Sequence, residues 1–203
     1  MNLAREKILG RVRAALAPLK TRAAYPDFSG QAVATTSPLS GDVGERFKAR
    51  LELVGGKAFE EASALAAWLK AEDYTRGYCD PALWPRLSSA FGAGFTVETS
   101  FDRQRVDDYQ FGITQAVGAI AESGSIILND STTSSRLGAL APWVHIAVVS
   151  KQQILPDLMS AVNALGNDPN IIWCTGPSKT ADVEGILIQG VHGPGAQIAL
   201  LEP

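Results

Sequence analysis

Apolar residues recur at helical spacing at the start of the chain. Ile8, Val12 and Leu19 belong to this series, and charged residues fill the positions between them. The spacing predicts a helix over residues 3–16. Two interpretations remain open: a targeting or partner-binding helix, or an arm that packs on its own domain or on a second subunit. Glu6 and the lack of serine fit a transit peptide poorly.

From residue 42 onward, segments of helical periodicity alternate with short, uncharged apolar runs. The helical segments cover residues 43–54 and 61–71. The strand-like runs cover residues 57–59, 78–79, 95–98, 111–121, 125–128, 144–149, 171–175 and 197–201. Uncharged runs of this kind are typical of parallel strands whose two faces are both covered. The alternation predicts an α/β domain with βαβ crossovers and a mostly parallel sheet.

The expected sheet suggests where a ligand would bind. In open parallel sheets, ligands bind beyond the carboxyl ends of the strands. The segments that follow Ala121, Val149 and Thr175 are therefore the expected places for chemistry.

Residues 21–41 separate the first helix from the α/β pattern. They are rich in Ala, Ser, Thr, Pro and Gly and show no periodicity, which is typical of an extended linker. We therefore expect two parts: an N-terminal helix and linker over residues 1–41, and a folded domain over residues 42–203.

Composition excludes several classes of protein. The 203 residues carry a formal net charge of −3, so no basic surface favours nucleic acid. Cys79 and Cys174 stand far apart, outside any CxxC or Cys/His cluster, so we expect no iron–sulfur cluster and no metal bound by this chain alone. The N-terminus lacks the pattern of a secretory signal, and no apolar run is long enough to span a membrane. We expect a cytoplasmic protein.

A carboxylate stands between two apolar runs, in the sequence Glu122-Ser123-Gly124-Ser125. Glu122 could act as a general base, a nucleophile or an anchor for a ligand. The alternative is a β-hairpin turn in which Glu122 is solvated or pairs with Arg136.

A hydroxyl-rich segment, Asn129–Arg136, ends in an arginine. Hydroxyls beside a guanidinium suit a carboxylate or phosphate ligand, which makes Arg136 a candidate binding residue. The alternative is a solvated loop in which Ser134 or Ser135 caps a short helix before Pro142.

The segment Thr175–Asp182 leaves a predicted strand and is expected to enter a short helix. The free amides of a helix start would bind an anion together with Thr175, Gly176, Ser178, Lys179 and Thr180. A helix capped by Ser178 or Thr180, with no ligand, explains the same residues.

Glycines surround one of the two histidines in the sequence Gly190–Pro194. Gly190 and Gly193 let the backbone turn sharply around His192, whose imidazole could titrate near neutral pH. A histidine in this setting is either structural or lines a pocket. His145 lies within an apolar strand, and there we expect a hydrogen-bonded residue of the core or of a strand end.

The same motifs, in the same order, resemble the LUD-domain family of lactate-utilization proteins, most closely the protein C type. The resemblance extends from about residue 111 to the C-terminus and includes the first helix. It rests on Gly112-Ile113-Thr114, Ala119-Ile120-Ala121-Glu122-Ser123-Gly124-Ser125, Arg136, Pro142, His145-Ile146-Ala147-Val148-Val149, Thr175–Glu184 and Gly190–Pro194.

The resemblance implies a three-layer α/β/α fold similar to ribose-phosphate isomerase, glucosamine-phosphate deaminase and CoA-transferase subunits. It also implies a role in oxidising L-lactate to pyruvate beside two partner proteins that carry iron–sulfur clusters. A site formed by Glu122, Arg136, residues 175–180 and His192 would bind a small anion. The alternative is an independent enzyme of the CoA-transferase or phosphosugar-isomerase type that uses Glu122 as nucleophile. The sequence identifies no cofactor.

Overall fold

The computed structural model describes residues 3–18, 41–165, 170–181 and 185–203. The chain divides into two compact units, residues 1–38 and 39–203, with the division close to the predicted boundary at residue 41. Most of the predicted linker lies outside the described residues.

The N-terminal unit contributes one described helix, α1 (Leu3–Leu16), at the position the spacing predicts. None of its residues is buried, and Ile8 and Val12 are 63% and 48% exposed.

The second unit is built on a six-stranded sheet in which every strand is parallel to its neighbours. Its two longest strands lie side by side in the middle, where their backbones pair along seven residues. In spatial order the strands are β1 (Lys57–Phe59), β12 (Ala196–Glu202), β7 (Val144–Ser150), β4 (Phe111–Gln115), β2 (Arg76–Cys79) and β3 (Thr96–Glu98). The prediction of a mostly parallel sheet is confirmed.

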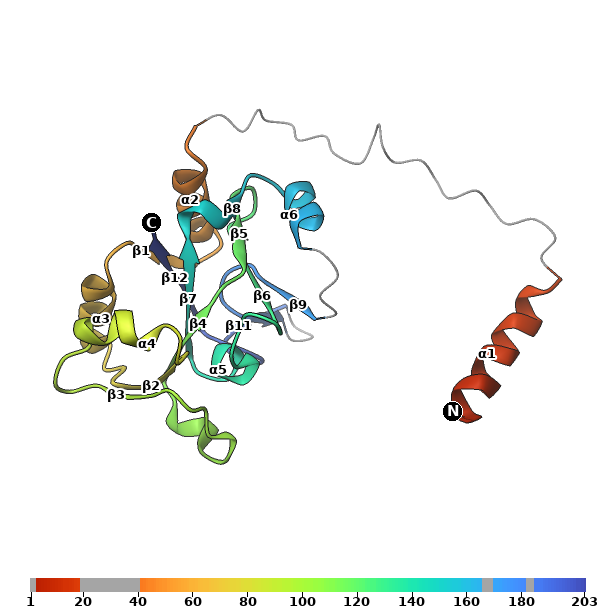
Figure 1. The fold of residues 1–203 in the computed structure, drawn as a ribbon, viewed down its shortest axis with the longest axis horizontal. Coiled ribbons are helices and arrows are strands. Elements are labelled where there is room, and N and C mark those ends of the chain that lie inside the picture. The colour runs from red at the N-terminus through yellow and green to blue at the C-terminus, as the bar shows by residue number, and fades with distance from the viewer. Residues whose placement is uncertain (1–2, 19–40, 166–169, 182–184) are drawn as a thin grey trace. The chain divides into compact units, whose positions relative to one another are not determined.

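Short helices cover one face of the central sheet. These are α3 (Ala62–Ala71), α4 (Trp84–Leu87) and the 3-10 turn η1 (Ser88–Ala90), which lie together on one side in Figure 1. Leu65 and Leu69 of α3 pack with Phe111 and Ile146 of the sheet in a fully buried core. Removal of this apolar area from water stabilises the layer.

A second, four-stranded sheet covers much of the other face, together with α2 (Val43–Leu53) and the short helix α5 (Arg136–Leu140). Phe47 and Leu51 of α2 pack there against Ala147 and Leu201. The outer face of the second sheet carries α6 (Leu158–Ala164). The strands of the second sheet, in spatial order, are β8 (Ile154–Leu155), β5 (Gly118–Ile120), β6 (Ser125–Asn129) and β9 (Ile171–Cys174).

Two apolar runs that were predicted to be strands of the parallel sheet belong to the second sheet instead. Residues 125–128 and 171–175 do not enter the parallel sheet, because β6 runs antiparallel to both β5 and β9. Strand β9 lies at an edge and is only partly buried. An apolar run alone does not distinguish a central parallel strand from an edge strand that is covered on one face.

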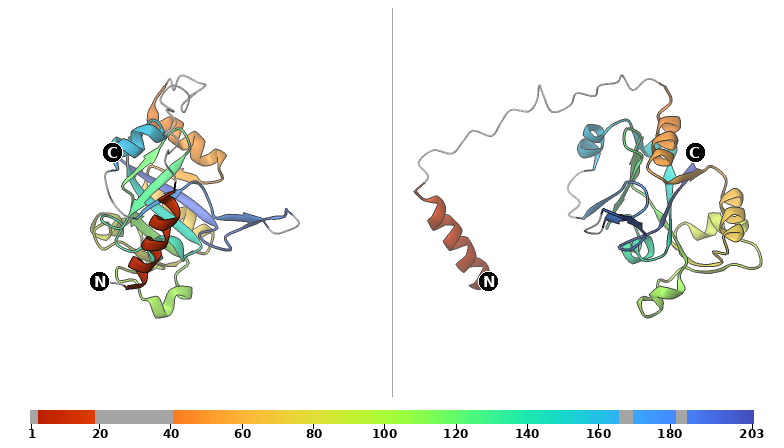
Figure 2. Two further views of the ribbon diagram at one scale, coloured as in Figure 1. Left: turned by 90° about the vertical axis from the view of Figure 1, so that its right-hand side faces the viewer. Right: turned by 180° about the vertical axis from the view of Figure 1, so that it is seen from behind.

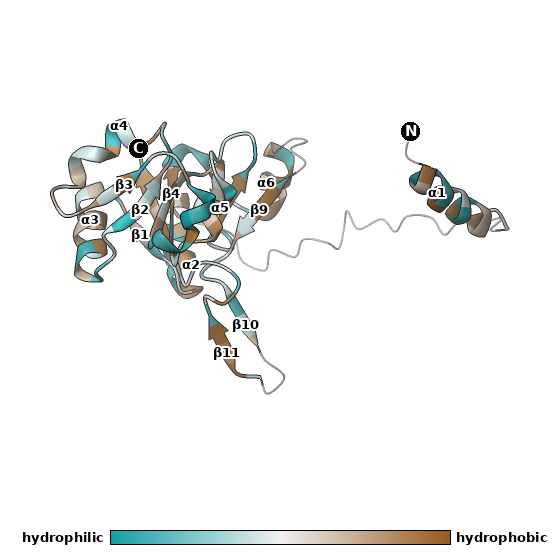
Figure 3. Cartoon of the chain, turned by 90° about the horizontal axis from the view of Figure 1, so that it is seen from below, coloured by the Kyte–Doolittle hydropathy of each residue, from teal (hydrophilic) through white to brown (hydrophobic). Residues whose placement is uncertain are grey.

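A two-stranded hairpin, β10 (Lys179–Ala181) and β11 (Leu187–Gln189), projects from the body (Figure 2, left). Figure 3 shows that β11 is apolar, and its Leu187 is 70% exposed. Two 3-10 segments, η2 (Arg103–Asp108) and η3 (Lys151–Gln153), complete the elements. Among the described residues, no helix is both long and apolar enough to cross a membrane.

Candidate functional site

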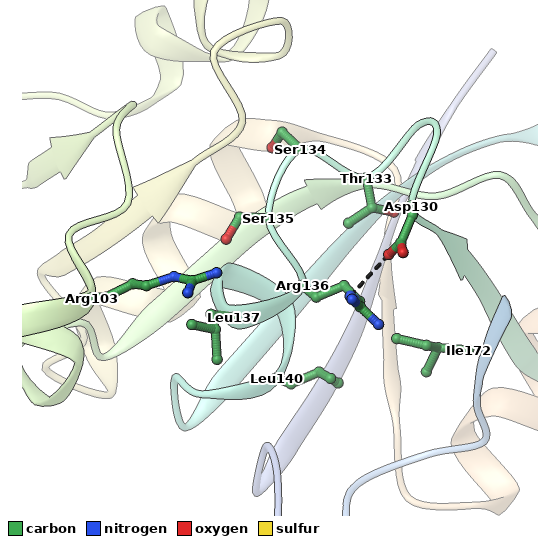
Figure 4. A pocket seen from close by; sticks show the side chains of 9 residues that line it. All are labelled: Arg103, Asp130, Thr133, Ser134, Ser135, Arg136, Leu137, Leu140 and Ile172. Atoms are coloured by element: carbon green, nitrogen blue, oxygen red, sulfur yellow. Dashed lines mark ion pairs between the residues drawn. The ribbon is translucent and has the colours of Figure 1, made fainter. Parts of the chain in front are cut away.

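The larger of two adjoining cavities has a volume of about 610 Å³ and is bordered by two arginines. Arg103 extends from η2 toward α5, whereas Arg136 extends from α5 toward Asp130 and Ile172 (Figure 4). Arg136 Nε lies 2.9 Å from Asp130 Oδ1. Within the described part of the chain, the Arg103 side chain forms neither an ion pair nor a hydrogen bond. The described lining therefore holds two guanidinium groups and one carboxylate, a charge balance that is positive.

Two features of helix α5 position Arg136: its N-cap and its close packing on the sheet. The Ser135 side chain accepts the backbone N–H of Gly138 at 3.0 Å and caps the first turn, which confirms the predicted capping role. Gly112 of β4 and Gly138 of α5 allow the helix to lie directly on the sheet. A Cβ at residue 112 would stand 1.7 Å from the Gly138 carbonyl oxygen. The arginine is therefore held on a closely packed element.

The other hydroxyls of the loop mainly hold it in place. Thr133 Oγ1 donates to the Gln115 carbonyl at 3.0 Å, and Ser134 Oγ lies 2.6 Å from the Tyr78 hydroxyl. Burial raises the pKa of Tyr78, so this phenol stays protonated near neutral pH. The arginines, rather than the hydroxyls, remain to contact a ligand.

The second cavity, of about 480 Å³, shares the side chains of Leu140 and Ile172 with the first. It lies where β9 and the loop before β12 approach each other. Its remaining lining residues are Trp173, Cys174, Thr175, Gly176, Pro177, Ser178, Lys179, His192, Gly193, Pro194 and Gln197. None of the described lining residues is a carboxylate. Burial raises the pKa of Cys174 to about 11, so its thiol is also uncharged near neutral pH.

The helix expected after Thr175 is absent from the described part of this segment, which corrects the prediction of an anion site at a helix start. Residues 179–181 form β10 and pair antiparallel with β11; Asp182 lies outside the described residues. Lys179 Nζ donates to the Val54 carbonyl at 3.0 Å, at the end of α2. A cation is favourable at a helix C-terminus, so Lys179 stabilises α2. Thr180 pairs with Ile188 within the hairpin.

Three hydroxyls link β9 to the turn between β5 and β6. Ser125 Oγ lies 2.7 Å from both Thr175 Oγ1 and Ser123 Oγ. The segments after Ala121 and Thr175 therefore meet as expected. The segment after Val149 leads into η3 and lines neither cavity.

Glu122 lies apart from the arginines. Its Oε2 accepts the backbone N–H of Leu158 at 3.1 Å, at the first residue of α6. The residue occupies the turn of an antiparallel hairpin, as the structural alternative predicts, and it borders neither cavity. Arg136 pairs with Asp130 instead of Glu122. The structure therefore places Arg136 on the first cavity and the predicted residues Thr175, Gly176, Ser178, Lys179 and His192 on the adjoining second cavity. Glu122 lies at neither cavity.

His192 borders the second cavity as an exposed side chain, together with Gly193. Gly190, at a φ of 80°, adopts a left-handed conformation beside the ring of Trp143. A Cβ at residue 190 would stand 2.3 Å from that ring. Gly190 thus fixes the course of the loop and borders a smaller cavity of about 280 Å³ on the other side of it.

The cavities also differ from the expected location at the carboxyl ends of the parallel strands. The loop before β12 and the helix before β7 form much of their walls, so they lie toward the amino ends of these two strands. The reason is that β5 and β9, which were expected in the parallel sheet, belong to the second sheet.

Sequence reasoning missed Arg103 and Gln197. Arg103 stands in a charged segment without periodicity, and only the tertiary fold brings it to α5. Gln197 gave a usable signal, because it is the one polar side chain within the apolar run 196–201. Among residues 3–18, 41–165, 170–181 and 185–203, no group of three or more His, Cys, Asp or Glu side chains could hold a metal ion.

The fold defines an α/β domain with two adjoining cavities. The chain belongs to the LUD-domain family, whose model matches residues 66–201. Lactate utilization protein C of Bacillus licheniformis is 35% identical over 99 residues, which are 45% of this chain and 41% of that relative. The protein of the same name in Macrococcus caseolyticus is 40% identical over 91 residues, or 41% of this chain and 39% of that relative. The matches thus span about two fifths of these curated relatives.

A crystal structure supports the fold. The DUF162 family protein from Deinococcus radiodurans superposes with a TM-score of 0.59 at 24% sequence identity. The superposition covers 82% of this chain and all of the other. At this identity the likeness extends to the architecture alone.

Proposed function

We propose that this protein is a cytoplasmic component of an L-lactate utilization system and binds a small carboxylate between Arg103 and Arg136. The observation that carries the proposal is the excess of positive charge at the larger cavity, where Asp130 is the one carboxylate among the described lining residues and two of these residues are arginines. A guanidinium can donate two parallel hydrogen bonds to a carboxylate, as found in lactate and pyruvate. The names of the curated relatives supply the metabolic setting.

The charge balance of the cavity gives a directional test by isothermal titration calorimetry with L-lactate and pyruvate. We expect Arg103→Gln and Arg136→Gln each to weaken binding about tenfold or more, because each removes a charge-assisted hydrogen bond. Asp130→Asn should strengthen binding, because it releases Arg136 from its ion pair.

Arg50→Gln is the matched control, since Arg50 is exposed on α2 and borders neither cavity. Equal affinities in all four variants, or absence of binding by the wild-type protein, would contradict the proposal. Neither result would depend on protein partners.

Helix α1 is the proposed contact with iron–sulfur partner proteins, because its apolar stripe is exposed. Removal of residues 1–41 should leave the Tm of the remaining domain unchanged within a few degrees. The shortened chain begins at Asp42, whose Oδ1 accepts the Glu45 N–H at 2.9 Å and keeps the cap of α2. Pull-down with the purified partners should lose the complex, whereas Arg11→Gln in the full chain should retain it. Retention of the complex by the shortened chain would place the contact elsewhere.

No observation on the described residues favours a CoA-transferase-like enzyme, because Glu122 hydrogen-bonds to the start of α6 and borders neither cavity. The role of the second cavity is a separate question.

A further inference from the structure

Three polar side chains form a buried chain across the central sheet. Thr114 of β4, His145 of β7 and Gln197 of β12 are 0%, 0% and 3% exposed. Thr114 Oγ1 lies 2.9 Å from His145 Nε2, and His145 Nδ1 lies 3.1 Å from Gln197 Oε1. All three lie on the sheet face that packs against the second sheet, among apolar neighbours. Buried polar groups are costly to a core unless hydrogen bonds satisfy them, as they do here.

The direction of these hydrogen bonds follows from the backbone beside Gln197. Gln197 Nε2 lies 3.5 Å from the Ile198 carbonyl, so reversal of the amide would place two oxygens against each other. Gln197 Oε1 therefore accepts, and His145 must donate through Nδ1–H. His145 Nε2 is then left without a proton and accepts from the Thr114 hydroxyl. Both hydrogen bonds therefore point the same way, from Thr114 to His145 and from His145 to Gln197, and the imidazole between them is neutral.

Gln197 is also where this buried chain meets the second cavity. The oxygen of Gln197 accepts from His145, and one proton of its amide nitrogen is directed at the Ile198 carbonyl. The second amide proton is therefore the group that Gln197 can offer to a ligand. Ser178 and His192 add a hydroxyl and an imidazole to the same lining, in which no residue that the structure describes carries a carboxylate. The cavity is thus rich in donors and suits a molecule that presents oxygen acceptors.

We propose that the second cavity is a binding subsite for the oxygen atoms of a 2-oxo or 2-hydroxy acid, that Gln197 donates to these oxygens, and that His145 and Thr114 are positioning residues for Gln197. The inference rests on the proposed function for its ligand class, but it concerns different residues from Arg103 and Arg136. Thr114 is not among the described residues that line the second cavity. Any effect of Thr114 on a ligand must therefore pass through His145 and Gln197.

Nuclear magnetic resonance of the full-length, ¹⁵N-labelled protein tests both parts. We expect His145 to carry its ring proton on Nδ1, as reported by the ¹⁵N shifts of the two ring nitrogens. The Gln197 side-chain NH₂ signals, assigned by their loss in Gln197→Leu, should shift saturably as pyruvate is added. They should also shift in Arg136→Gln, so loss of the arginine site and loss of this subsite are distinguishable.

Variants of Thr114 separate a positioning role from a merely structural one. Thr114→Val should place part of the His145 population in the Nε2–H form and weaken the pyruvate response of Gln197 about tenfold, as for the loss of one oriented hydrogen bond. Thr114→Ser keeps the hydroxyl and should restore both readouts. In the wild-type protein, pyruvate should also shift the backbone amide signals of the lining residues Ser178 and Gly193. Gln197→Glu should abolish this shift, whereas Gln152→Glu, on the exposed η3, should not.

Two results would overturn the proposal. One is a wild-type His145 that carries its proton on Nε2. The other is a set of Gln197 signals that neither pyruvate nor L-lactate moves while the protein is folded. If Thr114→Val is too unstable to study, the wild-type tautomer and the Gln197 titration still decide the question.

Discussion

Gly112→Ala is expected to destabilise the domain by about 3 kcal/mol or more and to weaken carboxylate binding at the same time. The new Cβ would stand 1.7 Å from the Gly138 carbonyl oxygen and 2.9 Å from its carbon. Both atoms belong to backbone, so no side-chain rotation can relieve the overlap, and α5 must move away from β4. Overpacked cores commonly lose about 1–3 kcal/mol, and a clash between backbones lies at or beyond the upper end of that range.

Urea unfolding, followed by circular dichroism, measures the first effect, and calorimetry with L-lactate measures the second. Gly92→Ala is the control, because a Cβ there meets no atom within 4 Å. Its free energy of unfolding should stay within about 1 kcal/mol of the wild-type value. If Gly112→Ala retains wild-type stability, α5 does not pack on β4 as described, and the position of Arg136 would need revision.

The contact between Gly112 and Gly138 also illustrates what a sequence can predict. The apolar run that contains Gly112 predicted a strand, and the alternative of a cap at Ser134 or Ser135 included the N-cap of α5, which is Ser135. Both are local signals, set by burial and by one hydrogen bond. The closeness of the two glycines is a tertiary property, because it depends on a helix and a strand that are about 25 residues apart. For the same reason, no local pattern around Arg103 indicates that it approaches α5.

The prediction of a helix after Thr175 was wrong for a related reason. The hydroxyls and glycine of this segment match a capped helix start, but its backbone pairs with β11, which begins several residues later. Strand pairing is non-local and depends on its context, so it can override a local preference for a helix. Glu122 shows the opposite case, because the simpler interpretation of a hairpin turn matched the structure. The position of a carboxylate between two strands does not establish that it faces a ligand.

The burial of His145 was predicted from its local sequence, but its contact with Gln197 was not. The apolar run around His145 indicated a hydrogen-bonded histidine of the core or of a strand end, and the structure buries the side chain completely. The strand register then places Gln197 directly beside it on β12. The two residues are 52 positions apart in the chain, so only the order of the strands reveals that they touch.

Burial of His145 also predicts a loss of stability in mild acid. Desolvation lowers the pKa of His145 from 6.5 to about 4, because the interior disfavours an imidazolium. Between these two values the unfolded chain binds a proton at this residue and the folded chain does not. The free energy of unfolding therefore falls as pH drops through this window, by about 3 kcal/mol in total from this residue. Above pH 6.5 the contribution is constant.

Urea unfolding at several pH values between 4 and 7 measures the effect as a difference between two proteins. His145→Asn keeps a donor that can reach Gln197 but does not titrate in this range, so its stability should depend less steeply on pH than that of the wild-type protein. The comparison cancels the contribution of carboxylates that titrate in both proteins. Glu60 is an example: hydrogen bonds from Lys151 and Lys48 lower its pKa to about 2. His192→Ala retains His145 and should keep the steep dependence. Parallel curves for the wild-type protein and His145→Asn would mean that His145 is protonated in the folded state, and the assigned Nδ1–H form would then be wrong.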